Sequence, residues 1–478
     1  MKKTTLLSLF AALFITVAAP LVAQETESAA VRHVADGTIL QCWCWSFNTI
    51  KDNMKQIADA GFTALQTSPI NTCRIGEYGG LALMSKDTSG KWYFHYQPTD
   101  WKIGNYQLGT RDEFKAMCDE AKKYNITVIV DVLPNHTTQV NKFSRAEMAN
   151  LFAAVGGEDK LYHANGLKNI SDYNKRSEVI SEEVGGLPDV NTENPDFQAY
   201  FMTFMNDAID CGAGGFRFDT AKHIALPDDP KDPSSPENDF WEIFTGKKDI
   251  RGVSLHNSKD LFEYGEVLQG GASREADYPK YLRVVASSYG ANLRMAIRFS
   301  NLSTARISNY SHPADPSRLI TWIESHDTYA NQGESAKMTN FQLRVGYALI
   351  TARQLGTPLF FSRPQGPEAT QFPGVSQIGD IGNDQFHDPE VSAVNHFRTA
   401  VAGEPEKLSN GASNAQLIIE RGSKGFVLIN MDKDASTFKF ETQLPDGTYI
   451  DHAHEKKYTI KKGAFSGRVP GESIIVIY

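Results

Sequence analysis

Four short segments each end a hydrophobic run and each carry at least one acidic residue; they span residues 130–136, 215–219, 262–266 and 322–327. The stretches between them are long enough to hold helices. In a (β/α)8 barrel, acids at the ends of separate parallel strands are brought to one face of the barrel. Three such acids could supply a nucleophile, a proton donor and a stabilising charge for cleavage of a glycosidic bond.

Three acids in these segments have surroundings that suit those roles. Arg217 precedes Asp219 by two residues, so the two side chains share a strand face and the guanidinium would keep the carboxylate ionised, as a nucleophile requires. Glu266 could be a general acid if burial or a second carboxylate raised its pKa. Asp327 could stabilise positive charge on the sugar. Each acid alone could equally be a strand-end ion pair or a solvated loop residue, so the prediction rests on their combination.

Other side chains in and between these segments suit a sugar ligand. The run 91–96 is dense in aromatic residues, whose faces stack on sugar rings while their polar edges bind hydroxyls. Core packing is the alternative for such a run and is expected for Phe94, but a loop position favours a cleft role for Trp92, Tyr93 and Tyr96. His136 and His326 are hydrogen-bonding groups suited to sugar hydroxyls, although a lone histidine is more often structural.

A Ca2+ site is also predicted. Asn135, Asp189 and the backbone carbonyl of His223 are oxygen donors at the edges of an irregular stretch, and oxygen-only ligands suit Ca2+. Asn and Asp are also ordinary loop residues, so their spacing does not decide the matter.

Strand and helix patterns alternate along most of the chain, which predicts parallel strands with covering helices. The predicted strands span residues 37–47, 62–67, 126–131, 215–219, 261–265, 319–323 and 357–361, with a sixth barrel strand expected between residues 293 and 302. The predicted helices span residues 50–60, 112–123, 196–211 and 341–355.

The pattern changes in two places and divides the chain. Residues 136–189 are polar and contain two Gly-Gly pairs, which predicts a domain inserted after the third strand. Short alternating runs after residue 404 predict a C-terminal antiparallel β-sandwich over residues 404–478. The barrel is then expected to comprise residues 32–135 and 190–403.

Composition restricts the compartment and the partners. Residues 1–24 have a basic start and an apolar run that ends in small residues, which predicts a signal peptide and a secreted or periplasmic protein with no membrane anchor after cleavage. Those residues carry two Lys and no acid, so the net charge of −9 becomes −11 without them. An acidic protein is not expected to bind nucleic acid. Five Cys without metal-type spacing favour buried free thiols, with one disulfide left open.

These motifs together resemble the α-amylase family, glycoside hydrolase family 13. The four acidic segments look like its four signature regions, and residues 187–191 look like its additional fifth region. Further segments are similar to the Bacillus subtilis-type secreted members: residues 45–49, 67–71, 96–99, 103–105, 221–224, 226–229 and 360–364. The resemblance covers roughly residue 37 to the C-terminus, and it is specific because so many motifs agree.

The resemblance implies a retaining endo-hydrolase of α-1,4-glucans such as starch, glycogen and maltooligosaccharides. It implies that Asp219 is the nucleophile, Glu266 the acid/base and Asp327 the transition-state stabiliser. Residues implied to line the subsite of the cleaved sugar are Arg217, His136, His326, Tyr96 and Gln97. Lys222 and His223 would face the leaving group. The implied Ca2+ would hold the inserted domain against the barrel.

Two alternatives remain open from the sequence. A related enzyme could be a transglycosylase or a glucosidase, although the Lys222-His223 pair favours binding of long chains as in amylases. A non-catalytic glucan-binding protein could use the same fold, since fold does not give function. The intact acids Asp219, Glu266 and Asp327 argue against that second alternative.

Ser325 stands where chloride-activated members carry Asn, so a chloride site is not expected. A monomer is expected.

Overall fold

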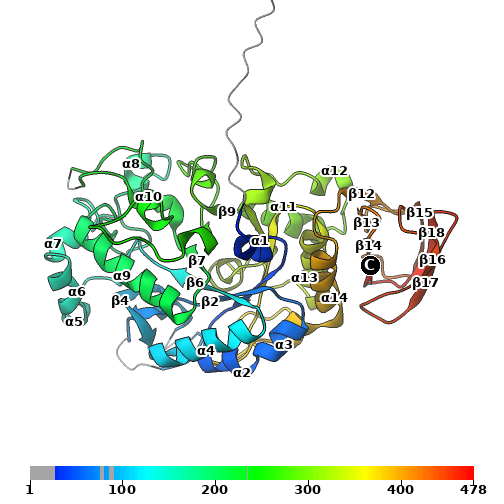
Figure 1. Cartoon of the computed structure of the whole chain (residues 1–478), viewed down its shortest axis with the longest axis horizontal. Coiled ribbons are helices and arrows are strands. Elements are labelled where there is room, and N and C mark those ends of the chain that lie inside the picture. The colour runs from blue at the N-terminus through cyan, green and yellow to red at the C-terminus, as the bar shows by residue number, and fades with distance from the viewer. Residues whose placement is uncertain (1–26, 76–79, 85–90, 234) are drawn as a thin grey trace, which may run out of the picture.

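The computed structural model describes residues 27–75, 80–84, 91–233 and 235–478, so the predicted signal peptide lies outside the described residues. The described residues form a closed barrel of parallel strands in the order β1-β11-β10-β9-β8-β7-β6-β2 (Figure 1). The barrel strands are β1 (Ile39–Cys42), β2 (Ala64–Thr67), β6 (Thr127–Val132), β7 (Gly215–Phe218), β8 (Phe262–Gly265), β9 (Arg283–Val285), β10 (Leu319–Trp322) and β11 (Thr357–Phe361). The predicted (β/α)8 barrel is therefore confirmed.

The barrel strands are short and almost wholly buried, because both of their faces are covered. The sixth strand is β9, so the prediction that placed it between residues 293 and 302 is wrong. Residues 287–298 form helix α11 instead, since Leu293, Ala296 and Ile297 recur at helical spacing and are buried together. A strand of only three residues carries too little pattern to be recognised.

The first predicted strand and helix also differ in detail. β1 ends at Cys42, and Cys44 has a left-handed backbone (φ 62°) that no strand could continue through. The Ser46 side chain then caps a new helix, so the expected single helix over residues 50–60 is observed as two short ones.

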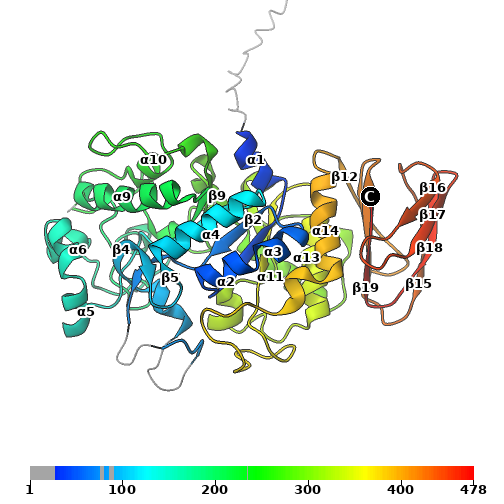
Figure 2. The ribbon, with the colours of Figure 1, turned by 60° about the horizontal axis from the view of Figure 1, so that its bottom comes forward.

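Helices cover the outside of the barrel (Figures 1 and 2). They are α2 (Phe47–Asp52), α3 (Met54–Asp59), α4 (Arg111–Lys123), α9 (Pro195–Cys211), α10 (Phe240–Phe244), α11 (Ser287–Arg298), α12 (Thr304–Ile307), α13 (Asn340–Ala352) and α14 (Pro389–Ala400). Helix α1 (Ala29–Ala35) instead packs Val31 and Val34 against strand residues such as Ile39 and Ile320. Capping residues mark the ends of two of the longer helices. Thr110 and Glu113 form a capping box at the start of α4, and Gly212 ends α9 in the left-handed conformation.

Two further groups of elements extend from the barrel between strand and helix. After β2, the chain forms a small sheet of β3 (Asn71–Cys73), β4 (Pro98–Asn105) and β5 (Gly109–Thr110). After β6, it forms the short helices α5 (Lys142–Glu147), α6 (Ala149–Ala154), α7 (Glu158–Leu161) and α8 (Arg176–Val179). The irregular stretch predicted after the third strand corresponds to this second group.

The C-terminal part forms two antiparallel sheets, as predicted, at the end of the molecule away from α5–α7 (Figure 1). One sheet contains β12 (Glu406–Asn410), β13 (Gln416–Arg421), β14 (Gly425–Asn430) and β19 (Ser473–Ile477). The other contains β15 (Ser436–Glu441), β16 (Gly447–Ile450), β17 (Lys457–Lys461) and β18 (Ala464–Val469). Their facing side chains, among them Phe426, Phe438 and Phe465, form a separate hydrophobic core.

Two other sequence expectations concern single features. All five Cys are buried and free, as favoured. Within the described residues, no helix is long and apolar enough to cross a membrane.

Candidate active site

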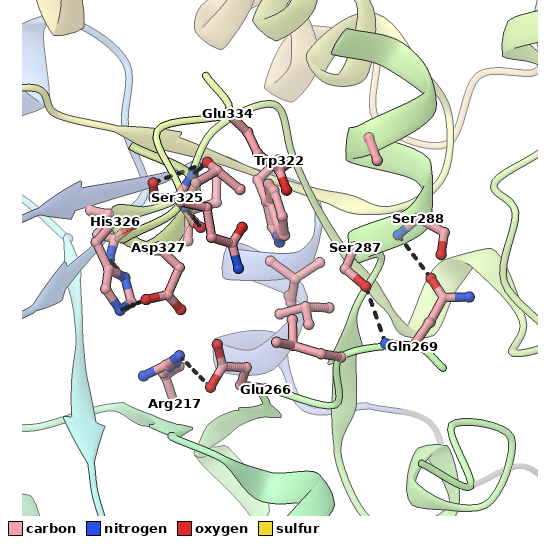
Figure 3. A pocket seen from close by; sticks show the side chains of 18 of the residues that line it. Arg217, Glu266, Gln269, Ser287, Ser288, Trp322, Ser325, His326, Asp327 and Glu334 are labelled. Carbon is pink, nitrogen blue, oxygen red and sulfur yellow. Dashed lines mark hydrogen bonds and ion pairs between the residues drawn. The ribbon is translucent and has the colours of Figure 1, made fainter. Parts of the chain in front are cut away.

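The three predicted catalytic acids lie at the carboxyl ends of barrel strands. Asp219 follows β7, Glu266 follows β8, and Asp327 begins a single π-helical turn after β10. The side chains of Glu266 and Asp327 lie near those of Arg217 and His326 (Figure 3), and Asp219 is bonded to the same arginine. Parallel strands place their carboxyl ends on one face of the barrel, and this explains how acids 108 residues apart in the sequence meet.

A cleft of about 680 Å³ lies over these acids. All the predicted catalytic and sugar-contacting residues except Arg217 line it: Tyr93, Tyr96, Gln97, His136, Asp219, Lys222, His223, Glu266, His326 and Asp327. Arg217 lies beneath, where it lines a second hollow of about 280 Å³ that shares Glu266, His326 and Asp327 with the cleft. Figure 3 shows this second hollow, which extends between Glu266 and Trp322 toward Gln269 and Glu334.

Arg217 links the carboxylates. Its Nη1 donates to Asp219 Oδ1 at 2.6 Å and to both oxygens of Asp131 at 2.7 and 2.9 Å. Its Nη2 lies 3.1 Å from Glu266 Oε2. The carboxyls of Asp219 and Glu266 therefore lie within reach of a single guanidinium group. Asp131, the acid of the first of the four segments, is thus bound to the same arginine.

The surroundings of Asp219 and Glu266 shift their pKa values in opposite directions. Burial opposes ionisation of Asp219, but the charge of Arg217, helped by His136 and His326, outweighs burial and lowers the pKa of Asp219. Burial raises the pKa of Glu266 to about 7, and the attraction of Arg217 does not overcome it because the neighbouring carboxylates act in the same direction as burial. At neutral pH one acid is ionised and the other holds its proton for much of the time.

The remaining polar groups around the acids are held by the fold. Asn331 Nδ2 donates to Asp327 Oδ1 at 2.5 Å. The imidazole of His326 stacks on the Tyr96 ring with 4.9 Å between centroids, and its Nδ1 lies 3.1 Å from Gln41 Nε2. His136 Nε2 lies 3.1 Å from the Tyr96 carbonyl.

Two groups that touch this site were not predicted from the sequence. Gln41 on β1 holds His326, and the only sequence signal was a polar residue inside an apolar strand. The backbone amide of Thr220 donates to Glu266 Oε2 at 3.0 Å from a left-handed conformation (φ 47°). A backbone donor of this kind leaves no signal in residue types.

Lys222 and His223 lie on the side of the cleft that faces the inserted segment. The Lys222 Nζ lies 5.9 Å from the centre of the Tyr173 ring. The His223 imidazole is buried, and its Nδ1 lies 2.7 Å from the Val179 carbonyl. His223 therefore contacts the inserted segment directly as well as lining the cleft.

The residues predicted to bind Ca2+ lie where the inserted segment meets the barrel. The backbones of Asn135 and Asp189 are neighbours, since the Val190 amide donates to the Asn135 carbonyl at 2.8 Å. Asp189 Oδ2 lies 2.6 Å from His163 Nδ1, and His163 Nε2 lies 2.7 Å from Glu193 Oε2. Asp189 Oδ1 is buried and has no hydrogen-bond partner among the described residues. His163 was not predicted.

This donor set is suited to a hard cation. No group of three or more His, Cys, Asp or Glu side chains in the described part of the chain could hold a metal. The predicted set is of another kind, with one carboxylate, one amide and one backbone carbonyl. A buried carboxylate oxygen without a partner is costly, and an oxygen-ligated cation would satisfy it.

Two models of known protein families match the chain. The family model "Alpha amylase, catalytic domain" matches residues 46–343, and "Alpha amylase, C-terminal all-beta domain" matches residues 409–477. An alpha-amylase of Butyrivibrio fibrisolvens is 45% identical, with 96% of this chain and 49% of the relative covered. An alpha-amylase of Clostridium acetobutylicum is 37% identical, with 93% and 54% covered. The chain thus spans about half the length of these curated relatives.

Solved structures share the fold. Wild-type alpha-amylase I of Eisenia fetida superposes with a TM-score of 0.74 at 20% sequence identity, covering 92% of this chain and 97% of the other. The alpha-amylase of Geobacillus thermoleovorans, solved with acarbose, gives a TM-score of 0.68 at 17% identity, covering 93% and 98%.

Proposed function

The chain belongs to the α-amylase family, and from this membership and the site geometry we propose that it hydrolyses internal α-1,4-glucosidic bonds of starch, glycogen and maltooligosaccharides with retention of configuration. One observation carries the proposal: Arg217 contacts both Asp219 and Glu266, whose pKa values are shifted in opposite directions. Retaining glycosidases need a close carboxyl pair of which one member is ionised and the other protonated.

The roles follow from these protonation states. The Asp219 carboxylate attacks the anomeric carbon while Glu266 gives its proton to the departing glycosidic oxygen, so the glycosidic bond breaks as the ester to Asp219 forms. Water then gives a proton to the Glu266 carboxylate and its oxygen attacks the same carbon. This attack releases Asp219 and leaves the α-configuration. Asp327, beside both acids, stabilises the positive charge that the sugar carries in each transition state.

The cleft residues bind and orient the glucan. Tyr96 and His326 form a stacked pair beside the acids, which suits the apolar face and the hydroxyls of the cleaved sugar. His136, Gln97 and Tyr93 also line the cleft. Lys222 and His223 lie toward the inserted segment and are assigned to the leaving-group side. Among the fold neighbours, alpha-amylase I of Eisenia fetida is known in complex with maltohexaose.

We also propose a bound Ca2+ with Asn135, Asp189 and the His223 carbonyl as ligands. The unpartnered buried Oδ1 of Asp189 supports the site. The ion would have a structural role, because it would join the inserted segment to the barrel. This chain's own residues already make that junction polar, with His163 between Asp189 and Glu193.

The remaining expectations are part of the same proposal. The protein acts outside the cytoplasm as a monomer, after removal of residues 1–24. Residues 136–189 act as a separate domain that forms one side of the cleft, and residues 404–478 form the C-terminal domain.

Digestion of soluble starch tests the proposal. With the wild-type protein, iodine staining is expected to disappear while the concentration of reducing ends is still low, because internal bonds are cut. The products are expected to appear first as α-anomers by NMR. The Glu266→Gln variant should lose at least about 100-fold in kcat, since the general acid is removed. Glu263→Gln is the matched control. Glu263 is a buried acid on β8, the strand that leads to Glu266, and it is not among the described residues that line the cleft or the second hollow.

Three results would contradict the proposal. Cyclic or transferred glucans as main products would indicate a transglycosylase. Products that first appear as β-anomers would exclude retention. Starch binding without turnover by the wild-type protein would indicate a glucan-binding role.

A further inference from the structure

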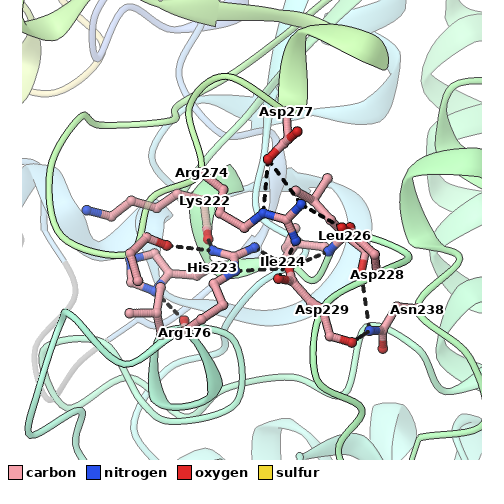
Figure 4. A network of polar contacts seen from close by, with 12 residues as sticks. Arg176, Lys222, His223, Ile224, Leu226, Asp228, Asp229, Asn238, Arg274 and Asp277 are labelled. Atoms are coloured by element: carbon pink, nitrogen blue, oxygen red, sulfur yellow. Dashed lines mark hydrogen bonds and ion pairs between the residues drawn. The ribbon is translucent and has the colours of Figure 1, made fainter. Parts of the chain in front are cut away.

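Arg176, in helix α8 of the inserted segment, makes a dense set of contacts with the barrel. Its Nε and Nη2 donate to Asp229 Oδ2 at 2.9 and 2.5 Å, and Nη1 donates to the carbonyls of Lys222 and Ala272 at 2.7 and 3.2 Å. Nη2 also donates to Tyr278 Oη at 2.7 Å. One guanidinium thus joins the inserted segment to the loops that follow β7 and β8 (Figure 4).

The partners of Arg176 strengthen one another. Asp229 is buried, and its other oxygen accepts a hydrogen bond from Arg274 Nη1 at 2.7 Å. The Tyr278 hydroxyl lies within hydrogen-bonding distance of the carbonyls of both Lys222 and Ile224. Charge-assisted hydrogen bonds at buried sites are stronger and more directional than exposed ones. The loop over residues 220–229 is therefore held at its backbone.

That loop forms the leaving-group side of the cleft. The Lys222 carbonyl accepts from Arg176, while its side chain extends away from the network (Figure 4). The Lys222 Nζ faces Tyr173, which also lines the cleft. The Tyr173 carbonyl in turn accepts from the Ala272 amide at 2.9 Å, next to the carbonyl that Arg176 holds.

We propose that Arg176 is a positioning residue for the leaving-group side of the cleft, which fixes Lys222 and Tyr173 so that glucan units beyond the cleaved bond can bind. Arg176 itself need not touch the substrate. Its effect should grow with the number of sugar units on the leaving-group side. This inference rests on the proposed glucan hydrolysis, but its backbone part can be tested without catalysis.

Two substrates separate the effect on the leaving-group side from the chemical step. Maltoheptaose occupies both sides of the cleft, whereas a chloronitrophenyl α-maltotrioside has a single aryl ring as its leaving group. Arg176→Gln should raise KM for maltoheptaose by about 3- to 30-fold. Its kcat on the aryl maltotrioside should stay within about twofold of wild type, because Arg217, Asp219 and Glu266 are unaltered. Arg176→Lys, which retains the charge, should recover part of the lost binding.

Arg274→Gln is the matched control. Arg274 also pairs with Asp229 but, among the described contacts, bonds to Asp228, Asp229 and Asp277 and not to the Lys222 backbone. Its KM for maltoheptaose should therefore stay close to wild type. Equal effects of Arg176→Gln and Arg274→Gln would overturn the proposal, as would equal losses of Arg176→Gln on both substrates.

Hydrogen exchange of the free protein supplies a readout that needs no turnover. Arg176→Gln should speed amide exchange in residues 171–180 and 220–229 relative to wild type and to Arg274→Gln. Unchanged exchange there would overturn the proposal even if wild-type protein hydrolyses starch. If Arg176→Gln exchanges faster but the wild-type protein lacks hydrolase activity, the positioning role is supported and the proposed function is rejected. If Arg176→Gln does not fold, Arg176→Lys takes its place in both comparisons, with effects of the same direction and smaller size.

Discussion

Arg217 contacts three carboxylates, and the different surroundings of those carboxylates decide which of them ionise. Burial raises the pKa of Asp131 to about 7 despite two short bonds to the guanidinium. The pKa of Asp219 is lowered and that of Glu266 is raised to about 7. A single cation cannot neutralise three buried anions, and Glu266, whose 3.1 Å contact with Arg217 is the longest of the three, is suited to hold a proton.

The pH dependence of kcat/KM tests these shifts. Glu266 must be protonated to act as acid, and its pKa is raised, so activity should persist at neutral pH and fall as pH rises through about 7. Asp219 must be ionised, and its pKa is lowered, so the acid limb should lie below the usual range of an aspartate. The profile is measured on an aryl maltotrioside between about pH 3 and 10. Activity that stays constant from pH 6 to 9 would contradict the assignment of Glu266.

At the scale of elements, the junction between β6 and the inserted segment depends on buried polar contacts. His163 lies between Asp189 and Glu193. Burial alone would lower the pKa of His163, but its contacts with these two carboxyl groups raise that pKa to about 10. Two acidic side chains at this junction flank a single imidazole, so the junction can accept further positive charge. Ca2+ at Asp189 Oδ1 would supply it.

Thermal unfolding with and without Ca2+ tests this arrangement. A ligand that binds only the folded state stabilises it by about 2.7 kcal/mol at 100 times its Kd, so wild-type protein should melt several degrees higher in Ca2+ than in EDTA. Asp189→Asn should abolish the difference between the two Tm values. Glu193→Gln, which changes the other neighbour of His163 and keeps the Asp189 carboxylate, should retain it. Equal Tm values for wild-type protein in Ca2+ and EDTA would exclude the site.

At the scale of the molecule, the C-terminal sheets are held to the barrel through backbone carbonyls as well as side chains. Arg421, at the end of β13, is buried and donates to the carbonyls of Ala352, Arg353, Val401 and Glu404. Ala352 and Arg353 lie at the end of α13 and Val401 at the end of α14, where helices leave carbonyls without intrahelical donors, and Glu404 lies in the loop that follows. One side chain therefore caps two barrel helices and links them to the sheet.

Replacement of Arg421 should weaken the whole molecule without changing the active site. Arg421→Met removes the donor to the carbonyls of Ala352 and Glu404, at about 1–3 kcal/mol for each unsatisfied group, so the urea midpoint should fall markedly. The carbonyls of Arg353 and Val401 keep Arg398 and the Glu404 amide as donors. The kcat on starch at a temperature where the variant is folded should equal that of wild type. Lys424→Met, which removes an exposed partner of Glu404, should change the unfolding free energy by less than about 0.5 kcal/mol. A similar loss in both variants would contradict the assigned role of Arg421.

Much of the architecture could be predicted because its signals are local. Alternating strand and helix patterns identified the barrel, and strand-end acids at Asp219, Glu266 and Asp327 identified the candidate site. The exception among the barrel strands, β9, has three residues and is followed by a helix with a stronger pattern. The roles of the site residues, the Ca2+ ligands and the domain boundaries stay predictions, and the resemblance to Bacillus subtilis-type members is neither supported nor contradicted by the relatives described.

Local sequence patterns identify the side chains that end most of the barrel strands, because the side-chain period of a strand and the caps of a helix depend on a few consecutive residues. Which of these side chains contact the same charged group depends on tertiary packing. The two-residue spacing predicted that Arg217 would meet Asp219, but its contacts with Asp131 and Glu266 depend on the order and register of β6, β7 and β8. Arg176 and His163 were not predicted for the same reason: their partners are distant in the chain, and only packing of the inserted segment on the barrel brings them together.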